Sequence, residues 1–162
     1  MATIVYALFE GREPADAAAT ELGKRTPEHP NFSVQTHDRR PLITPEVESS
    51  LYKMVCNRTQ EKHRSRIVSI GGVEDHIHLL LALRPTICIS KYAGDIKGAS
   101  SHFLNGTFNF NTPFRWQEGY GAFTINPFQL DPVIDYIENQ REHHANRTLW
   151  TEYERRNVLQ ID

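Results

Sequence analysis

Cysteine is scarce in this chain, and long apolar runs are missing. The 162 residues include two cysteines, Cys56 and Cys88, and neither belongs to a Cys-x-x-Cys pair. Such sparse usage argues against a disulfide framework and against a cysteine-based zinc site. No apolar run approaches the roughly 18 residues that a membrane span needs, and the first ten residues lack the basic start of a signal peptide. We therefore expect a cytoplasmic protein with reduced thiols and no membrane segment.

The sequence also has little excess of either charge. Lys and Arg number 18 and Asp and Glu number 20, which gives a net charge of −2. Charge alone therefore gives no support to nucleic-acid binding, although a neutral body can still carry a basic groove. Hydrophobic residues make up 39% and charged residues 23%, as in ordinary globular proteins, and the length suits one domain.

The N-terminal part differs in composition from the rest. Residues 11–31, GREPADAAATELGKRTPEHPN, are small, polar and proline-containing. That composition is typical of a loop or a weakly ordered extension. We predict an extension over residues 1–30 and a single compact domain over residues 31–162.

Hydrophobic periodicity within that domain predicts alternating strands and helices. We predict strands at 32–36, 66–73, 76–83 and 114–125, the last with a glycine kink. We predict helices at 45–62 with Thr44 as N-cap, after Ser90 as N-cap, and at 132–147 with Asp131 as N-cap. The order β-α-β-β-α-β predicts an α+β, ferredoxin-like fold with an antiparallel sheet, followed by one added C-terminal helix.

The third predicted strand carries two histidines in EDHIHLLLAL, residues 74–83. Alternate strand residues share a face, so His76 and His78 point one way, onto the open face of the sheet. Ile77 and its alternate neighbours supply the buried face. Histidines two residues apart on a strand stand about 6.5–7 Å apart and can bind one metal ion, but a third ligand must come from elsewhere. Taken alone, the spacing more often marks two solvated histidines.

The last predicted helix carries YIENQ, which places Tyr136 and Gln140 four residues apart on one face. Val133 and Ile137 lie on another face and can anchor the helix to the core. The amide oxygen is a hard ligand that suits Mg²⁺ or Mn²⁺, and an assisted phenol can act as a nucleophile. The alternatives are a buried tyrosine ring with a solvated hydroxyl and an exposed glutamine.

The joint occurrence of these motifs resembles the HUH-type transposases that use a single catalytic tyrosine, together with the related REP-associated tyrosine transposases. The resemblance spans roughly residues 31–153. It is carried by DRRPLIT, GGVEDHIHLLLALRP, ISKYAGDIKGASSHFLN, FRWQEGYGAFTI and VIDYIENQREHH. It implies that His76 and His78 bind the metal, that Gln140 completes the metal site, and that Tyr136 is the nucleophile.

The resemblance also implies a function. Members of this family use Mg²⁺ or Mn²⁺ to cleave single-stranded DNA near a hairpin, forming a 5′-phosphotyrosine that a 3′ hydroxyl later attacks to reseal the strand. They work as homodimers, and the tyrosine helix can serve the histidines of the partner. This sequence departs from the family at Asn31 and His37, where His and Lys are commoner.

Seven further residues are candidate contacts to DNA, although a solvated surface or a core position is an equally good interpretation of several. They are Arg39, Arg40, Lys91, Lys97, Ser100, Arg115 and Trp116. His143 and His144 follow Tyr136 by seven and eight residues, so one of them can approach the site, but capping of the C-terminal end of their helix is the preferred interpretation.

Two other functions fit parts of the pattern. A non-catalytic nucleic-acid-binding module on the same sheet needs no intact Tyr136. A metal-dependent phosphodiesterase that uses activated water turns over without a tyrosyl adduct. Covalent attachment of DNA to Tyr136 discriminates the transposase from both.

Overall fold

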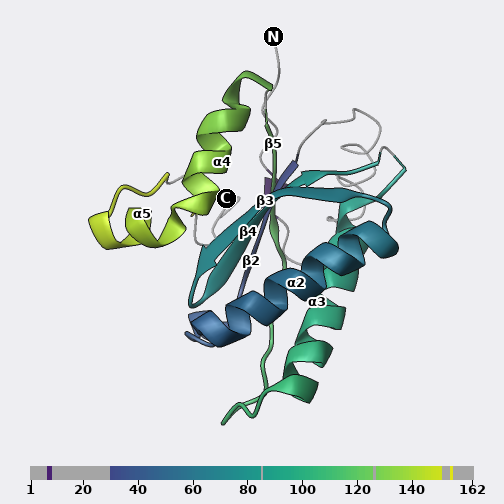
Figure 1. Ribbon diagram of the computed structural model, residues 1–162, viewed down its shortest axis with the longest axis vertical. Helices are drawn as coiled ribbons and strands as arrows, with labels where there is room; N and C mark the ends of the chain where they lie inside the picture. Colours follow the sequence, from purple (N-terminus) through teal and green to yellow (C-terminus); the bar gives the residue numbers. More distant parts are fainter. Residues whose placement is uncertain (1–6, 9–29, 85, 126, 151–153, 155–162) are drawn as a thin grey trace, which may run out of the picture.

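The sheet contains five strands, all paired antiparallel (Figure 1). The computed structural model describes residues 7–8, 30–84, 86–125, 127–150 and 154. The strands are β1 (Ala7–Leu8), β2 (Pro30–Gln35), β3 (Arg66–Val73), β4 (His76–Ala82) and β5 (Gly121–Thr124), in the order β1-β5-β2-β4-β3. The run β5-β2-β4-β3 is the order of the ferredoxin-like unit, so the predicted α+β fold is confirmed.

Helices cover both faces of this sheet (Figure 1). The first pair, α2 (Pro45–Glu61) and α3 (Ile89–Thr107), lies on one face. The second pair, α4 (Leu130–Glu138) and α5 (Gln140–Asn146), lies on the other. Within the described ranges, no helix is long and apolar enough to cross a membrane.

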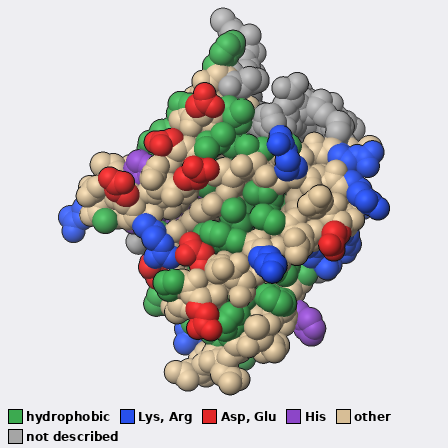
Figure 2. Space-filling view, viewed as in Figure 1, with side chains coloured by type: hydrophobic (Ala, Val, Ile, Leu, Met, Phe, Trp, Pro, Cys, Tyr) green, Lys and Arg blue, Asp and Glu red, His purple; other side chains and the backbone are tan. Residues whose placement is uncertain are grey.

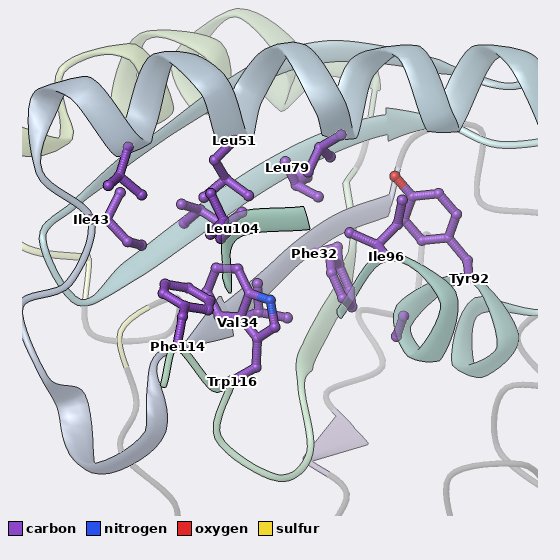
Figure 3. Close-up of a cluster of buried hydrophobic side chains, with 14 of the residues drawn as sticks. Phe32, Val34, Ile43, Leu51, Leu79, Tyr92, Ile96, Leu104, Phe114 and Trp116 are labelled. Carbon is purple, nitrogen blue, oxygen red and sulfur yellow. The ribbon is translucent and has the colours of Figure 1, made fainter. Parts of the chain in front are cut away.

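The main core lies between the sheet and the pair α2 and α3 (Figure 3). Phe32 and Val34 of β2 and Leu79 of β4 point into it, as the alternation predicts. Leu51 and Ile96 meet them from the two helices. Each fully buried aliphatic or aromatic side chain contributes about 1.5–3 kcal/mol relative to exposure, so this face supplies much of the stability.

A smaller apolar cluster fixes α4 on the opposite face. Leu80 of β4 packs with Val133 and Ile137 of α4, the two residues predicted to anchor the tyrosine helix. The helix backbone comes close to β3 at Gly71, where an added Cβ would lie 1.9 Å from the carbonyl oxygen of Ile137. Any side chain at position 71 therefore displaces the end of α4.

Several predicted boundaries are confirmed and others are wrong. The Thr44 hydroxyl accepts a hydrogen bond from Val47 N at the start of α2, as predicted. The N-cap of α3 is Cys88, not Ser90. The predicted fourth strand is regular only over β5, and Gly119 supplies the kink with φ 75°.

The predicted last helix is in fact two helices that meet at Asn139. This residue has φ −102° and ψ 24°, and its side-chain amide donates to the carbonyl oxygen of Asp135. Such side-chain to backbone bonds compete with helix continuation. The N-cap of α4 is Gln129, so Asp131 lies inside the first turn and is not the cap.

The N-terminal segment contributes β1, which pairs with β5. The rest of the predicted extension, residues 1–6 and 9–29, lies outside the described residues, so the boundary at residue 31 stays a prediction.

Candidate functional site

The histidine pair lies in a fully covered part of the sheet. His76 faces Gln35 of β2, and His78 faces Ser33. The exposed fractions of His76 and His78 are 2% and 0%, so the predicted open face is wrong. The cover comes from α4 and α5, because the helix after β5 returns across this face of the sheet.

The tyrosine helix brings Tyr136 against the same histidines. The rings of Tyr136 and His78 have centroids 6.2 Å apart. The tyrosine ring is stacked on Trp150 at 4.7 Å and lies 4.8 Å from the ring of His143. Strand and helix motifs separated by about sixty residues thus meet in one buried cluster.

Glu154 occupies the centre of this cluster, and the sequence interpretation missed it. Its Oε1 accepts a 2.7 Å hydrogen bond from the Tyr136 hydroxyl and lies 3.2 Å from His78 Nε2. Its Oε2 lies 3.3 Å from His76 Nε2. The ligand atoms of the two histidines and the glutamate all lie within 4.8 Å of one another.

The polar atoms around this point suit a divalent cation. His76 Nε2, both ring nitrogens of His78 and Gln140 Oε1 are buried, and the described residues offer them no hydrogen-bond partner of good geometry. Buried polar atoms are normally satisfied, so orphaned atoms converging on one carboxylate indicate a missing ligand. Two imidazoles with one carboxylate or amide oxygen form a ligand set typical of divalent metal ions.

The Gln140 side chain is buried beside Tyr136, as its spacing predicted. Its Nε2 donates to the Tyr136 carbonyl oxygen at 3.3 Å, which leaves Oε1 available as a ligand.

A neighbouring carboxylate orients His76. Asp75 Oδ1 accepts from His76 Nδ1 at 2.7 Å, and Asp75 Oδ2 accepts from Arg39 Nε at 2.7 Å. This arrangement fixes the tautomer that leaves Nε2 of His76 for a metal.

Burial and charge shift the ionisation of the whole cluster. Burial lowers the pKa of His76, but the hydrogen bond to Asp75 and the nearby Glu154 carboxylate outweigh it and raise the pKa to about 9. Burial also lowers the pKa of His78. The pKa of Glu154 is held well below its usual range, because the two imidazoles beside its carboxylate outweigh the opposing effect of burial. Burial and then the Glu154 hydrogen bond raise the pKa of the Tyr136 phenol, while the Gln140 side chain lowers it.

Helix α5 closes the site from one side. The ring of His144 lies 5.0 Å from that of His76, and its Nε2 lies 3.7 Å from Glu154 Oε2. Of the two interpretations of His143 and His144, approach to the site is therefore the one that the contacts support. Arg141 anchors the helix by donating to Glu74 Oε1 at 2.7 Å and to Glu48 Oε2 at 2.9 Å.

A groove of about 450 Å³ runs beside the site. Its lining includes Asp75 and His144, which contact the metal-ligand cluster, and the guanidinium groups of Arg39 and Arg141.

The candidate DNA-contact residues fall into two groups. Arg39 lies beside the site, and Arg40, Lys91 and Arg115 lie at least partly exposed. Lys97, Ser100 and Trp116 have structural contacts instead.

Lys97, Ser100 and Trp116 each form a hydrogen bond within the protein. Lys97 Nζ donates to the carbonyl oxygens of Gln117 and Gly119. Trp116 Nε1 donates to Ser100 Oγ at 2.7 Å, and both side chains are buried. Trp116 and Ser100 therefore belong to the core.

Comparisons with known proteins show the family of the chain. The family model described as "Transposase IS200 like" matches residues 29–140. The transposase for insertion sequence element IS200 of Salmonella typhimurium strain LT2 is 30% identical over 98 residues, and so is that of Salmonella typhi. The match covers 57% of this chain and 61% of each relative, so the chain spans less than two thirds of their length.

Two solved structures share the fold. A candidate transposase from Deinococcus radiodurans R1 has a TM-score of 0.58 and 23% identity, covering 69% of this chain and 89% of the other. A REP-associated tyrosine transposase bound to a REP hairpin has a TM-score of 0.58 and 15% identity, covering 84% and 90%. Because the family model covers more than half of its residues, the chain belongs to the IS200-like transposase family.

Proposed function

We propose that this protein cleaves and rejoins single-stranded DNA through a 5′-phosphotyrosine at Tyr136, with Mg²⁺ or Mn²⁺ bound beside it. One observation carries this proposal. The Tyr136 hydroxyl and the Nε2 atoms of His76 and His78 all converge on the Glu154 carboxylate. A nucleophile and a metal-ligand set within one hydrogen bond of each other can act on the same phosphate.

The residues that would hold the cation are His76 and His78, with oxygen ligands from Gln140 and Glu154. The first three were inferred from the sequence, and Glu154 is added because its carboxylate lies within reach of both imidazoles. A bound divalent cation supplies neutralisation of the phosphate oxygens and of the leaving oxygen.

The chain's own residues prepare the nucleophile. Stacking on Trp150 and packing beside His143 hold the Tyr136 ring in place. The hydroxyl is protonated before the reaction begins, because burial and Glu154 raise the pKa of the phenol. As the bond from Oη to phosphorus forms, the phenol loses its proton and the bond from phosphorus to the 3′ oxygen breaks. The 3′ oxygen gains a proton and departs as a hydroxyl.

Rejoining is the reverse of this step. A 3′ hydroxyl loses its proton and attacks the phosphotyrosine, the bond to Oη breaks, and the phenol of Tyr136 regains a proton. The energy of the original phosphodiester is kept in the covalent intermediate, so the cycle requires no nucleotide cofactor.

The contacts of Tyr136 support action on the histidines of its own chain, whose His78 ring is 6.2 Å away. The homodimer implied by the resemblance stays a prediction. A hairpin-containing DNA end is the substrate we propose, supported by the likeness to the tyrosine transposase bound to a REP hairpin.

The test is covalent trapping on a denaturing gel. Wild-type protein with hairpin-bearing single-stranded DNA and Mn²⁺ is expected to give a shifted band that Tyr136→Phe abolishes. Tyr52→Phe is the matched control, because Tyr52 also lies on a helix and donates to a glutamate, Glu48, at 2.8 Å. Cleavage that persists in Tyr136→Phe without an adduct would instead support a water-using phosphodiesterase. DNA binding with no cleavage by wild type or variants would support a non-catalytic module.

A further inference from the structure

Three arginines lie at the end of β3 and β4 farthest from His76. Arg66 begins β3 and pairs with Ala82, the last residue of β4. The backbone N–H of Arg84 donates to Ser65 Oγ at 3.2 Å, which ties the segment after β4 to the turn before β3. Arg64 lies in that same turn, and all three arginines are exposed. We name Arg64, Arg66 and Arg84 the arginine cluster.

The arginine cluster differs from the arginines that pair with carboxylates. Arg39 pairs with Asp75, Arg58 with Asp95, and Arg141 with two glutamates. No carboxylate among the described residues pairs with any member of the arginine cluster. Its guanidinium groups therefore keep all their donors for an external anion, and their charge adds to one local positive potential.

Basic and acidic side chains gather at different parts of the molecular surface. In Figure 2, Lys and Arg side chains gather toward the right, at the far ends of β3 and β4, whereas Asp and Glu side chains lie over α4. The exposed residues of α4 include Asp131, Asp135 and Glu138. A polyanion is therefore repelled by the outer surface of the tyrosine helix and attracted by the arginine cluster.

We propose that the arginine cluster binds backbone phosphates of the DNA that flanks the cleavage site. This inference rests on the proposed function, since it assigns a second contact to the same DNA. The occupant is a phosphate backbone because three exposed arginines lie on neighbouring chain segments and have no carboxylate partner among the described residues. The contact is independent of base sequence.

The length of β4 sets where on the DNA this contact falls. Six steps lead from His76 to Ala82, which pairs with Arg66, and a rise of about 3.3 Å per step separates the arginine cluster from His76 by about 20 Å. In the duplex stem of a hairpin lying along β4, DNA rises about 3.4 Å per base pair, so the contacted phosphates lie about six base pairs along the stem from the end beside the histidines. Shorter substrates reach the site without reaching the arginine cluster.

The experiment compares the double variant R66Q/R84Q with K53Q/R147Q, which removes two exposed basic residues elsewhere. DNA affinity is measured by fluorescence anisotropy over a range of salt concentrations. The slope of log K against log salt is expected to fall by about 1.4–1.8 in R66Q/R84Q, since each phosphate contact accounts for about 0.7–0.9. Adding R64Q to this variant is expected to lower the slope by a further amount of about 0.7–0.9. The control variant is expected to keep the wild-type slope.

A second measurement locates the contact on the DNA. Neutral methylphosphonates placed about six base pairs along the stem from the end beside the histidines are expected to weaken wild-type binding and to leave R66Q/R84Q unaffected. Unchanged slopes in R66Q/R84Q, or equal losses in both double variants, would overturn the proposal.

Substrate length separates this proposal from the proposed function. On a short substrate at saturating concentration, R66Q/R84Q is expected to form as much tyrosyl adduct as wild type. Absence of adduct in wild type would count against the proposed function, while the salt slopes would still decide the role of the arginine cluster.

Discussion

The two faces of β4 are equally buried but chemically opposite. Ile77, Leu79 and Leu81 lie at 0% exposure against the apolar side chains of α2 and α3. His76 and His78 lie at 2% and 0% on the other face, with ring nitrogens that lack well-formed partners among the described residues. Burial alone therefore does not distinguish the core from the site. The apolar face is satisfied by its own packing, whereas the histidine face keeps buried nitrogens that we propose a metal ion satisfies.

The largest effect on stability is expected on the apolar face. Leu79→Ala should reduce the free energy of unfolding by about 2–5 kcal/mol, because it removes packed methyl groups and leaves a cavity. Urea unfolding in metal-free buffer measures this loss. A loss below about 1 kcal/mol would show that the core between β4 and the helices α2 and α3 is loosely packed.

Addition of Mn²⁺ is expected to stabilise only proteins with an intact polar face. At a free concentration one hundred times the dissociation constant, binding should raise the free energy of unfolding by about 2.7 kcal/mol. His78→Leu should abolish this gain, since it removes one of the two imidazoles. Thermal unfolding of both proteins with and without Mn²⁺ gives the comparison, and an equal gain in both would place the metal elsewhere.

The Asp75 carboxylate is expected to have a smaller effect on the same site. Asp75→Asn should weaken Mn²⁺ binding about 10- to 100-fold, because His76 loses the partner that orients its ring. Isothermal titration calorimetry measures the affinity. Glu142→Gln, an exposed position on α5, serves as the control and should leave it unchanged.

His78→Leu in the absence of metal is the counterpart of Leu79→Ala on the opposite face. We expect its free energy of unfolding to stay within about 1 kcal/mol of wild type or to exceed it, because the change removes a buried group with unsatisfied nitrogens. A loss as large as that of Leu79→Ala would show that the two faces contribute equally to the free energy of unfolding, which contradicts the difference expected between them.

The smallest effect is expected at Asp95, whose carboxylate pairs with Arg58, Lys62 and His63. The hydrogen bond from Arg58 holds the pKa of Asp95 well below its usual range, with Lys62 and His63 adding to the effect. Since the unfolded carboxyl has a pKa near 3.9, its stabilisation is present above about pH 4 and is lost as the pH falls further. Stability measured below pH 4 should rise with pH more steeply in wild type than in Asp95→Asn, by at most about 1.4 kcal/mol per pH unit. Equal slopes would contradict this assignment.

Much of the fold follows from local patterns. The alternation in 76–83 places Ile77 and Leu79 in the core, and the Thr44–Pro45 pair marks the start of α2. Both features depend on neighbouring residues alone, so the sequence contains what is needed to predict them. Local patterns alone did not predict the contact between His78 and Tyr136. That prediction depended on the resemblance to a family in which the strand motif and the helix motif act together.

Other features depend on contacts that no local pattern encodes. Glu154 follows Tyr136 by eighteen residues, across α5, and no periodicity relates it to the histidines. The exposure of His76 and His78 was mispredicted because alternation assigns a face but does not say what covers it. The break at Asn139 is a local departure from helical dihedral angles within an otherwise regular helical pattern, and the hydrophobic periodicity does not mark it.

The most direct measurement of the central claim is the identity of the bond between protein and DNA. A hairpin-bearing strand labelled at its 3′ end is incubated with the protein and Mn²⁺, and the labelled peptide is identified by mass spectrometry after proteolysis. The proposed chemistry predicts that the 3′ label stays on a peptide containing Tyr136, while a 5′ label is released on a fragment with a 3′ hydroxyl. Attachment at another residue, or transfer of the 5′-labelled fragment to the protein, would contradict the claim.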